Sequence, residues 1–317
     1  MTDSLLRVAV VQAAPVIFDR EATLQKTLAL TREAAADGAK LILFPEAFIP
    51  GYPRGLTFGT VLGSRSELGR TLWEIYWASS MDVPGPDTEL LGEAAREAQA
   101  YLAVGVIERD SEFSGATLYC TLLYFGPDGS LLGKHRKLKP TAAERLVWGE
   151  GDGSTLTVVE TPHGNIGGLI CWENYMPLAR TAMYSKGVDI YLAPTADARD
   201  SWQATIRHIA CEGRCYVLSC NQYFTKDMYP ADFEGASELI EQPDVMSRGG
   251  SAIISPLGEV LAGPLFDKEG ILCKDIDLSA VPRSRFDFDA VGHYARPDVF
   301  QLIVNEKPQP PVNRLAD

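Results

Sequence analysis

Cys171 has the residue type and the position that nucleophilic chemistry requires. The apolar run before it, residues 165–170, predicts a short buried strand, and residues 175–186 have the composition and spacing of a helix. A cysteine at such a strand-to-helix elbow projects its sulfur into a cleft, where backbone N–H groups of the turn and the helix N-terminus favour a thiolate. The arrangement corresponds to a serine nucleophile elbow with sulfur in place of oxygen. Cys171 is therefore a candidate nucleophile.

A free cysteine in an apolar segment is commonly a small, inert core residue, and that alternative applies to Cys171. The residues that follow favour a functional site instead, because Trp172 to Tyr175 place four large side chains with polar heads at the end of an apolar strand. Side chains of this kind are expected to line a cavity rather than to continue a core.

Glu46 is a candidate general base. It follows an apolar run, residues 39–44, that predicts a buried strand, and its proline-bracketed loop contains Phe48, Ile49 and Tyr52. A solvated surface glutamate is the ordinary alternative. In this apolar setting the carboxylate would instead be desolvated, its pKa would rise, and it would suit proton transfer.

A basic run at residues 134–139 contains Lys137. On composition alone, a lysine in such a run is expected at the solvated surface. The segment that follows brings Glu144 and Arg145 close to the bulky Trp148. Charged groups therefore stand beside a large aromatic side chain here, as they do around Glu46.

Two other arrangements of reactive residues need to be weighed. His208, Cys211 and Cys215 have helical spacing and resemble half of a zinc site, but no second Cys or His pair has ligand spacing, so a helix core face explains them better. A Cys–His dyad remains open, because sequence separation does not exclude a partner for Cys171 among His135, His163 and His293. No phosphate loop or dinucleotide fingerprint is present.

The elements that must hold these residues are short strands, several of them joined as hairpins and separated by amphipathic helices. This pattern favours one layered α/β domain without internal repeats. Residues 226–247 are polar and irregular and predict a surface loop or an interface, and the proline-containing residues 306–317 predict a disordered tail. Strands are predicted at residues 5–13, 39–44, 102–108, 116–125, 130–134, 155–160, 165–170, 188–193, 216–220, 250–255, 259–262 and 271–276, and helices at residues 20–36, 66–78, 87–100, 175–186 and 201–213.

Composition narrows the class of protein. The 317 residues are 46% hydrophobic and 22% charged, as in an ordinary globular protein with a large core, and the net charge is -13. That charge argues against nucleic acid or an anionic membrane as a partner. No apolar stretch approaches the ~20 residues that span a bilayer. We recognise no secretory signal at the N-terminus, so the six cysteines are expected to be reduced thiols in the cytoplasm.

Three motifs in this order resemble those of the nitrilase branch of the carbon–nitrogen hydrolase superfamily. GAKLILFPEAFIPGYP, residues 38–53, resembles the glutamate motif of that family. HRKLKPT, residues 135–141, resembles its lysine motif together with Glu144 and Trp148, and GGLICWENYMPLAR, ending at Arg180, resembles its cysteine motif. Residues 292–297 resemble its C-terminal segment, so the resemblance extends over nearly the whole chain.

The resemblance implies an α/β fold, a four-layer αββα sandwich in a single domain over residues 1–300, followed by a C-terminal tail at residues 301–317. It implies Glu46 as general base, Cys171 as nucleophile, Lys137 as the group that stabilises the tetrahedral intermediates, and Glu144 as a supporting carboxylate. It implies no metal and no organic cofactor, and a homodimer or larger homo-oligomer.

The expected activity is hydrolysis of an organic nitrile (aryl, arylaliphatic or aliphatic) to the carboxylic acid and ammonia through a Cys171 thioimidate and thioester. Alternatives within the superfamily are an amidase or carbamoylase and a cyanide dihydratase. A catalytically silent scaffold is the alternative outside enzymes. Candidates for the substrate pocket are Trp172, Tyr52, Asn174 and Trp148, whose bulk suits an apolar or aryl substituent.

Overall fold

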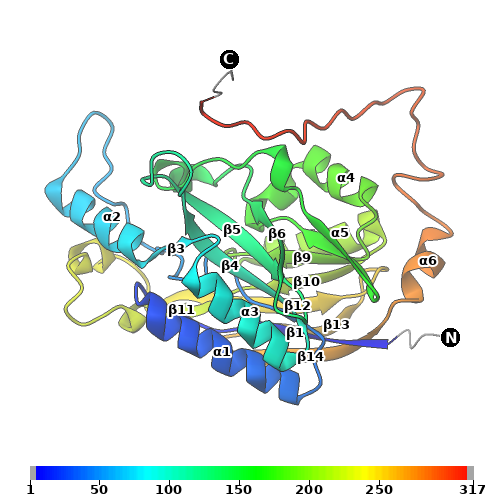
Figure 1. Cartoon of the computed structure of the whole chain (residues 1–317), viewed down its shortest axis with the longest axis horizontal. Helices are drawn as coiled ribbons and strands as arrows, with labels where there is room; N and C mark the ends of the chain where they lie inside the picture. Colours follow the sequence, from blue (N-terminus) through cyan, green and yellow to red (C-terminus); the bar gives the residue numbers. More distant parts are fainter. Residues whose placement is uncertain (1–4, 313–317) are drawn as a thin grey trace.

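The computed structural model describes residues 5–312, which form two seven-stranded sheets with helices outside them (Figure 1). The first sheet runs in the order β14 (Gly270–Asp277), β1 (Leu5–Gln12), β2 (Leu41–Leu43), β4 (Tyr101–Arg109), β5 (Leu118–Phe125) and β6 (Leu131–Arg136), with β3 (Met81–Asp82) paired to β4. The second runs in the order β11 (Tyr223–Thr225), β12 (Val245–Ile254), β10 (Tyr216–Cys220), β9 (Ile190–Pro194), β8 (Gly164–Gly168) and β7 (Val158–Thr161), with β13 (Val260–Phe266) paired to β12.

Helices α1 (Arg20–Ala36) and α3 (Pro86–Ala98) cover the outer face of the first sheet, and α4 (Pro177–Ser185) and α5 (Asp200–Gly213) cover that of the second (Figure 1). The other helices, α2 (Glu67–Ser79) and α6 (Ala280–Arg285), instead contribute Leu72, Tyr76 and Val281 to the apolar cluster between the sheets. The expectation about an N-terminal signal depends on residues 1–4, which lie outside the described residues. Within residues 5–312, no helix has the length and apolar character needed to cross a membrane.

The alternation of side chains along the strands builds the four layers. On β1, Val8 and Val10 belong to the apolar cluster between the two sheets, whereas Ala9 and Val11 belong to the cluster under α1 and α3. On the parallel strand β9, one face likewise joins the central cluster and the other packs on α4 and α5. Successive strand residues point to opposite faces, so residues 8–11 of β1 and residues 190–194 of β9 are apolar on both faces. The structure confirms the expected αββα sandwich.

Several predicted boundaries differ from the structure near the candidate site. The strand predicted to end at Lys134 continues to Arg136, because Arg136 pairs with Thr121 on β5. The helix predicted to begin at Tyr175 begins at Pro177, a residue that fits the first turn of a helix, where its missing N–H is not needed. The predicted loop 226–247 ends earlier than expected, because β12 begins at Val245 by pairing with β11.

The C-terminal segment contacts the body of the protein. Residues 301–312 contain no helix or strand, but the Gln309 N–H donates to Asp152 at 2.7 Å and Lys186 forms an ion pair with Glu306 at 2.9 Å. These contacts differ from the disorder predicted for residues 306–317. The last five residues lie outside the described part, and the domain boundary at residue 300 stays a prediction.

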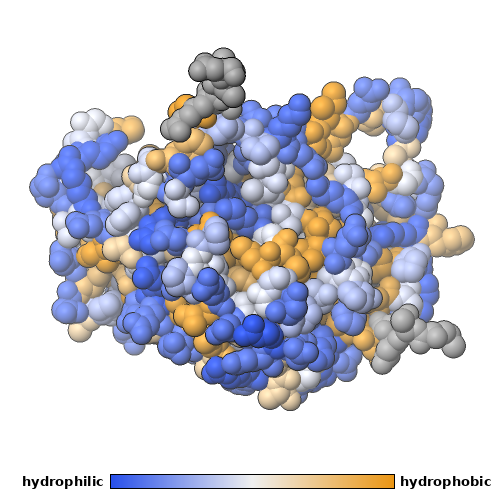
Figure 2. Space-filling view, in the orientation of Figure 1, coloured by the Kyte–Doolittle hydropathy of each residue, from blue (hydrophilic) through white to orange (hydrophobic). Residues whose placement is uncertain are grey.

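The surface agrees with the strongly acidic composition. Figure 2 shows a face that is largely hydrophilic and is interrupted by separate apolar patches. The exposed apolar side chains include Leu178 on α4 and, beyond α6, Phe286, Phe300 and Ile303. Single exposed apolar side chains are ordinary on soluble domains, and larger groups of them mark surfaces that contact other molecules.

Gly105 on β4 fixes the loop that carries Glu46. The Gly105 carbonyl accepts hydrogen bonds from the N–H groups of Phe48 (2.8 Å) and Ile49 (3.2 Å). A methyl group at residue 105 would lie 2.2 Å from the Pro45 carbonyl oxygen and 2.8 Å from the Glu46 Cα atom, so no side-chain rotation would relieve the clash.

We therefore expect Gly105→Ala to destabilise the fold by about 1–3 kcal/mol, in the range of overpacked cores, and to lower activity. Urea unfolding with a parallel activity assay measures both effects. Gly270→Ala on β14 is the matched control, because its methyl would meet only the end of the Leu265 side chain, at 3.2 Å. Equal stability of the two variants would contradict the prediction.

Candidate active site

A cavity of about 620 Å³ opens at the ends of strands from both sheets. Four of the predicted site residues, Tyr52, Glu144, Cys171 and Trp172, line it. Three arginines, Arg54, Arg199 and Arg248, also line it and were not singled out from the sequence. The cavity therefore combines a thiol, aromatic walls, carboxylates and arginines, and Arg199 and Arg248 pair with the lining carboxylates of Asp197 and Asp267.

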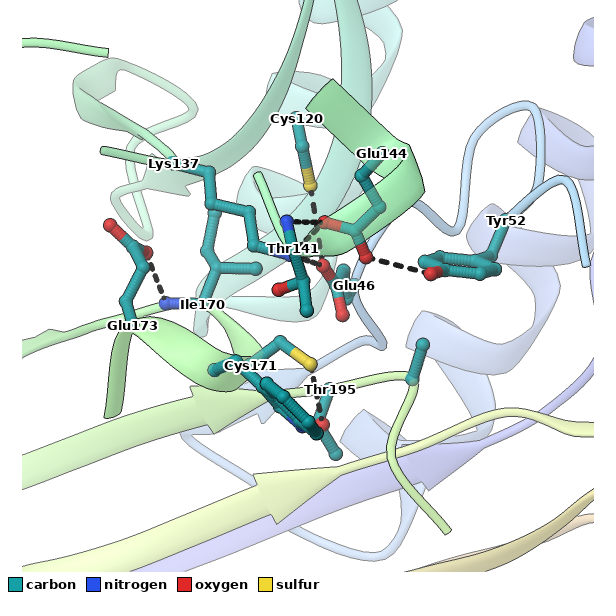
Figure 3. A network of polar contacts seen from close by, with 12 residues as sticks. Glu46, Tyr52, Cys120, Lys137, Thr141, Glu144, Ile170, Cys171, Glu173 and Thr195 are labelled. Atoms are coloured by element: carbon teal, nitrogen blue, oxygen red, sulfur yellow. Dashed lines mark hydrogen bonds and ion pairs between the residues drawn. The ribbon is translucent and has the colours of Figure 1, made fainter. Parts of the chain in front are cut away.

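The structure brings three of the predicted charged residues into one buried cluster (Figure 3). Lys137 lies between two carboxylates, with its Nζ atom 2.6 Å from Glu46 Oε1 and 2.7 Å from Glu144 Oε2. Glu46 follows β2 and Lys137 follows β6, so both come from the first sheet. Lys137 and Glu46 have fully buried side chains. The prediction of a surface lysine from composition alone is wrong, because two carboxylates compensate the burial of its charge.

Glu144 is itself held in place from two sides. It lies in a 3-10 turn, η1 (Ala142–Leu146), and its Oε2 atom accepts a hydrogen bond from the Thr141 N–H at 2.6 Å. Its Oε1 atom accepts a hydrogen bond from the Tyr52 hydroxyl at 2.7 Å. These bonds fix the carboxylate that holds Lys137.

Cys171 stands at a strained elbow. Its φ angle is +51°, a left-handed conformation that is uncommon for any residue with a side chain and that occurs at functional turns. β8 ends at Gly168, and a 3-10 turn, η3, covers Cys171–Tyr175. A methyl group at Gly168 would lie 1.9 Å from the Leu192 carbonyl oxygen, so the glycine lets β8 approach β9 closely just before the elbow.

The free oxygen of Glu46 is positioned as a proton acceptor. Among the described residues, Glu46 Oε2 is buried without a hydrogen-bond partner, and the Cys171 thiol is close enough to act on the pKa of this carboxyl. A second thiol, Cys120, lies 3.7 Å from the other oxygen, Oε1, but it is buried and does not line the cavity. Cys171 is thus the thiol that a bound molecule can reach.

Burial and the neighbouring charges set the protonation states. Burial raises the pKa of Glu46, and the charge of Glu144 adds to this, while Lys137 opposes it. Burial lowers the pKa of Lys137, but the charges of Glu46, Cys171 and Glu144 outweigh burial and raise it well above the ordinary value. Burial and the Glu46 charge raise the pKa of Cys171. The resting site therefore holds a neutral thiol, which needs a base to remove its proton.

Trp148 supports the cluster rather than the pocket. Its ring packs edge-on against Tyr52, with 5.6 Å between centroids, and lies 5.6 Å from Lys137 Nζ, within cation–π range. The side chain is buried and does not line the cavity. Of the four predicted pocket residues, Tyr52 and Trp172 line the cavity, and Trp172 remains 37% exposed.

Asn174 is not the pocket wall that the sequence suggested. Its side chain is buried beneath the elbow, where Nδ2 donates to the carbonyl oxygens of Leu169 (2.9 Å) and Cys171 (2.8 Å). Its Oδ1 atom accepts a hydrogen bond from the Tyr191 hydroxyl at 2.8 Å. Both polar atoms of the side chain therefore have partners inside the protein, and neither faces a substrate.

Glu173 and His135 are two site residues whose role sequence reasoning missed. The Glu173 carboxylate accepts a hydrogen bond from the N–H of Ile170, next to Cys171, at 2.8 Å (Figure 3). It accepts another from the N–H of Leu138, next to Lys137, at 2.6 Å. His135 Nε2 lies 3.0 Å from the same carboxylate, and the opposite ring nitrogen lies 2.9 Å from a backbone carbonyl.

One buried carboxylate therefore fastens the lysine segment to the cysteine elbow. Burial opposes the charge on His135, but the Glu173 carboxylate outweighs burial and raises the pKa of the imidazole. Both ring nitrogens of His135 are thus occupied, which removes it as the partner of Cys171. His163 packs on Tyr101, and His293 lies exposed beside Tyr294, so the proposed Cys–His dyad is not formed among the described residues.

The half zinc site suggested by His208, Cys211 and Cys215 is not assembled either. Cys215 is buried in the core beyond the end of α5, whereas Cys211 and His208 are exposed, and His208 lies 3.5 Å from Glu212. The helix core face predicted for these residues is therefore wrong for His208 and Cys211. Over residues 5–312, no group of three or more His, Cys, Asp or Glu side chains is arranged to hold a metal ion.

Comparison with known proteins agrees with this geometry. Residues 7–286 match the carbon–nitrogen hydrolase family. The chain is 59% identical over 304 residues to an aliphatic nitrilase from Sinorhizobium fredii, covering 96% of each chain. It is 52% identical over 311 residues to a bifunctional nitrilase/nitrile hydratase from Lupinus angustifolius, covering 97% of this chain and 88% of that one.

Solved structures share the fold at lower identity. A carbon–nitrogen hydrolase from Helicobacter pylori has a TM-score of 0.71 at 21% identity, with coverage of 94% of this chain and 97% of that chain. The NitFhit protein of C. elegans has a TM-score of 0.73 at 20% identity, with coverage of 98% and 70%. As its three motifs predicted, the chain belongs to the carbon–nitrogen hydrolase family, and by sequence it lies among the nitrilases of that family.

Proposed function

We propose that this protein is a nitrilase, which converts an organic nitrile and two water molecules into a carboxylic acid and ammonia. The observation that carries the proposal is the cluster itself, in which a reachable thiol, a buried carboxylate with a free oxygen and a buried lysine meet beside one cavity. The identity of 50–59% to proteins named nitrilases supports nitriles over other carbon–nitrogen substrates.

The first half of the reaction forms a covalent intermediate. Glu46 takes the proton of the Cys171 thiol while the sulfur attacks the nitrile carbon, and the proton passes to the nitrile nitrogen to give a thioimidate. A general base is needed at this step because the thiol is neutral at rest, its pKa being raised by burial and by the Glu46 charge. A soft thiolate suits the weakly electrophilic nitrile carbon.

The second half uses water twice. Glu46 activates a water molecule that adds to the thioimidate, and the tetrahedral intermediate expels ammonia and leaves a thioester. A second water molecule hydrolyses the thioester, which releases the carboxylic acid and restores the Cys171 thiol. Each addition places negative charge on a substrate atom, and Lys137 and the backbone N–H of Trp172 stabilise that charge. Trp172 is the second residue of its 3-10 turn, so its N–H belongs to the donors without a helical partner at a helix start.

Tyr52 and Trp172 are the proposed walls for the substrate substituent. A cavity of about 620 Å³ lies in the usual range for small-molecule sites and accommodates aliphatic, arylaliphatic or aryl groups. The carbon of a bound nitrile must come within reach of the Cys171 sulfur. Glu144 holds Lys137 and Tyr52 in fixed positions and so links the chemical cluster to the pocket wall.

The test is ammonia release by the purified protein from phenylacetonitrile, benzonitrile, an aliphatic nitrile, cyanide and the matching amides, with Cys171→Ala as control. We expect ammonia from at least one organic nitrile and none from the variant, and amide should be quantified as a second product. Ammonia from amides alone would make the protein an amidase or carbamoylase. Ammonia from cyanide alone would make it a cyanide dihydratase, and no product from any substrate would favour the scaffold.

We further propose that the protein works as a homodimer or larger homo-oligomer in the cytoplasm. The oligomer is implied by its family, and the exposed apolar residues Leu178, Phe300 and Ile303 support a contact surface. The cytoplasm is proposed because six cysteines suit a reducing compartment. Light scattering after size-exclusion chromatography tests the first statement, and cell fractionation tests the second.

A further inference from the structure

We propose that Thr195 is a further catalytic residue: its hydroxyl donates a hydrogen bond to the Cys171 sulfur, aims the thiol proton at Glu46 and stabilises the thiolate whenever it forms. The proposal rests on the proposed function, in which Cys171 is the nucleophile. Neither the residue type nor the three motifs identify Thr195, since it lies 24 residues beyond Cys171, directly after β9.

The position of Thr195 is fixed by the sheet. β9 pairs in parallel with β8, so the residues after both strands emerge at the same edge, and Thr195 arrives beside Cys171 (Figure 3). The Thr195 N–H donates to the Cys220 carbonyl at 2.9 Å, which continues the pairing with β10 by one residue. The side chain is fully buried and is therefore held in one place.

The contacts of the hydroxyl determine where its proton points. Thr195 Oγ1 lies 3.1 Å from Cys171 Sγ and 2.9 Å from the Asp197 backbone nitrogen. The Asp197 N–H is a donor, so the hydroxyl oxygen must accept from it. The hydroxyl proton is left for the sulfur, which accepts it through a lone pair.

This arrangement directs the thiol proton. Because Thr195 occupies a lone pair of the sulfur, the S–H bond of Cys171 points away from Thr195. The Oε2 atom of Glu46 is an acceptor without a hydrogen bond among the described residues, and the Cys171 thiol is close enough to act on the pKa of this carboxyl. The hydroxyl thus prepares the proton transfer that precedes attack on the nitrile.

The same hydrogen bond is stronger when the sulfur carries charge. A thiolate forms twice in each cycle, once when Glu46 removes the proton and once when hydrolysis of the thioester expels the sulfur. Hydrogen bonds to charged acceptors are about twice as strong as those between neutral groups. Thr195 therefore stabilises the thiolate at both steps more than it stabilises the resting thiol. In agreement, the hydrogen bond from Thr195 lowers the pKa of Cys171 against the larger, opposite effect of burial.

Thr195 also connects the nucleophile to the pocket wall. The loop residue Asp197, whose N–H donates to Thr195, accepts a hydrogen bond from Trp172 Nε1 at 2.9 Å. Burial raises the pKa of Asp197, but its hydrogen bonds with Arg199 and Trp172 outweigh burial and lower it. A displacement of this loop would therefore move Trp172 and change substrate binding, whereas loss of the hydroxyl proton would change the chemistry at sulfur.

The experiment compares Thr195→Val, which removes the hydroxyl at similar volume, with Thr195→Ser, which keeps it. Thr181→Val is the matched control, because its hydroxyl is exposed on α4 and bonds only the Pro177 carbonyl oxygen in the described structure. Two readouts are measured: kcat and KM for the best nitrile, and the rate at which iodoacetamide alkylates Cys171 as a function of pH, with the modified residue located by mass spectrometry.

We expect Thr195→Val to lower kcat about 10- to 100-fold with a smaller change in KM, in line with loss of one hydrogen bond to a charged group. Alkylation of Cys171 in Thr195→Val should need a higher pH than it does in the wild type. Thr195→Ser should restore kcat and alkylation to within about threefold, and Thr195→Ala replaces Thr195→Val if the latter does not fold.

The inference would be overturned if Cys171 in Thr195→Val were alkylated at the wild-type rate over the whole pH range. It would also be overturned by a serine variant as impaired as the valine variant, or by a change confined to KM, because each would mean that the hydroxyl matters only to the loop. If the wild type hydrolyses no nitrile but its alkylation still depends on the hydroxyl, the proposed function fails while the role of Thr195 at the thiol stands.

Discussion

Replacing Glu46 by glutamine is expected to lower nitrile turnover by about 10²–10⁴-fold, the usual contribution of a general base, while the protein stays folded. Glutamine keeps the shape of the side chain and its hydrogen bond to Lys137 but accepts no proton from Cys171. Single-turnover kinetics with circular dichroism of the purified variant measures the effect. Glu108→Gln is the matched control, since Glu108 is a buried carboxylate paired with Lys134 and Arg136 instead of with the thiol.

The pH dependence provides a second check on Glu46. Only the ionised carboxylate takes a proton, so activity falls as the pH is lowered through the pKa of Glu46. Burial raises that pKa above the 4.5 of an unperturbed glutamate, and the acid limb of kcat/KM should therefore lie above pH 4.5. The residual activity of Glu46→Gln should lack this limb. An unchanged acid limb in the variant would assign it to another group.

Replacing Lys137 by alanine is expected to reduce turnover by about 10³-fold or more, because two effects combine. The variant loses the cation that stabilises charge on the substrate, which alone is worth about 10²–10³-fold in comparable sites. It also loses the charge that opposes the raised pKa of Glu46, so Glu46 becomes protonated at higher pH and fails as a base. The acid limb should move to higher pH in the residual activity.

Lys139→Ala is the control for Lys137→Ala. Lys139 stands two residues later in the same basic run, but it is half exposed and pairs with the exposed Glu150. Ion pairs at the surface contribute little to the stability of the fold, so Lys139→Ala should retain near wild-type turnover. More than a tenth of wild-type activity in folded Lys137→Ala would remove the lysine from the mechanism.

The hydrophobic pattern of the sequence predicted helices and strands well where the buried residues recur with the period of the helix or strand. The helix at residues 20–36 has the predicted bounds, since Asp19 caps its first turn by accepting from the Ala22 N–H at 2.9 Å. The strands that precede Glu46 and Cys171 were predicted as buried because they are mostly apolar, as strands covered on both faces are. The layer order came from the family resemblance and agrees with the structure.

The pairing of site residues could not be predicted from the residues alone. Glu46 and Lys137 are 91 positions apart, and their contact depends on two strand ends meeting at one edge of the first sheet. Thr195 reaches Cys171 only because β9 lies beside β8. Such contacts are set by strand order, which local sequence does not encode.

The error at Asn174 and the omission of Glu173 share one cause. We expected all four residues after Cys171 to face a cavity, but a tight 3-10 turn sends Glu173 and Asn174 inward and leaves Trp172 and Tyr175 outside. A signal was available, because a glutamate three residues after Ile170 is placed to accept from its N–H, as in a capping box.

The division of the site between the two sheets affects when the active protein comes into existence during synthesis. The first sheet supplies Glu46 and Lys137, the second supplies Cys171, and neither sheet holds the complete chemistry. β14 is the edge strand of the first sheet and pairs with β1 from the opposite end of the chain. The first sheet is therefore complete only after translation has passed residue 277. Until the two sheets pack together, the Cys171 thiol has no base beside it, and the growing chain carries an ordinary cysteine.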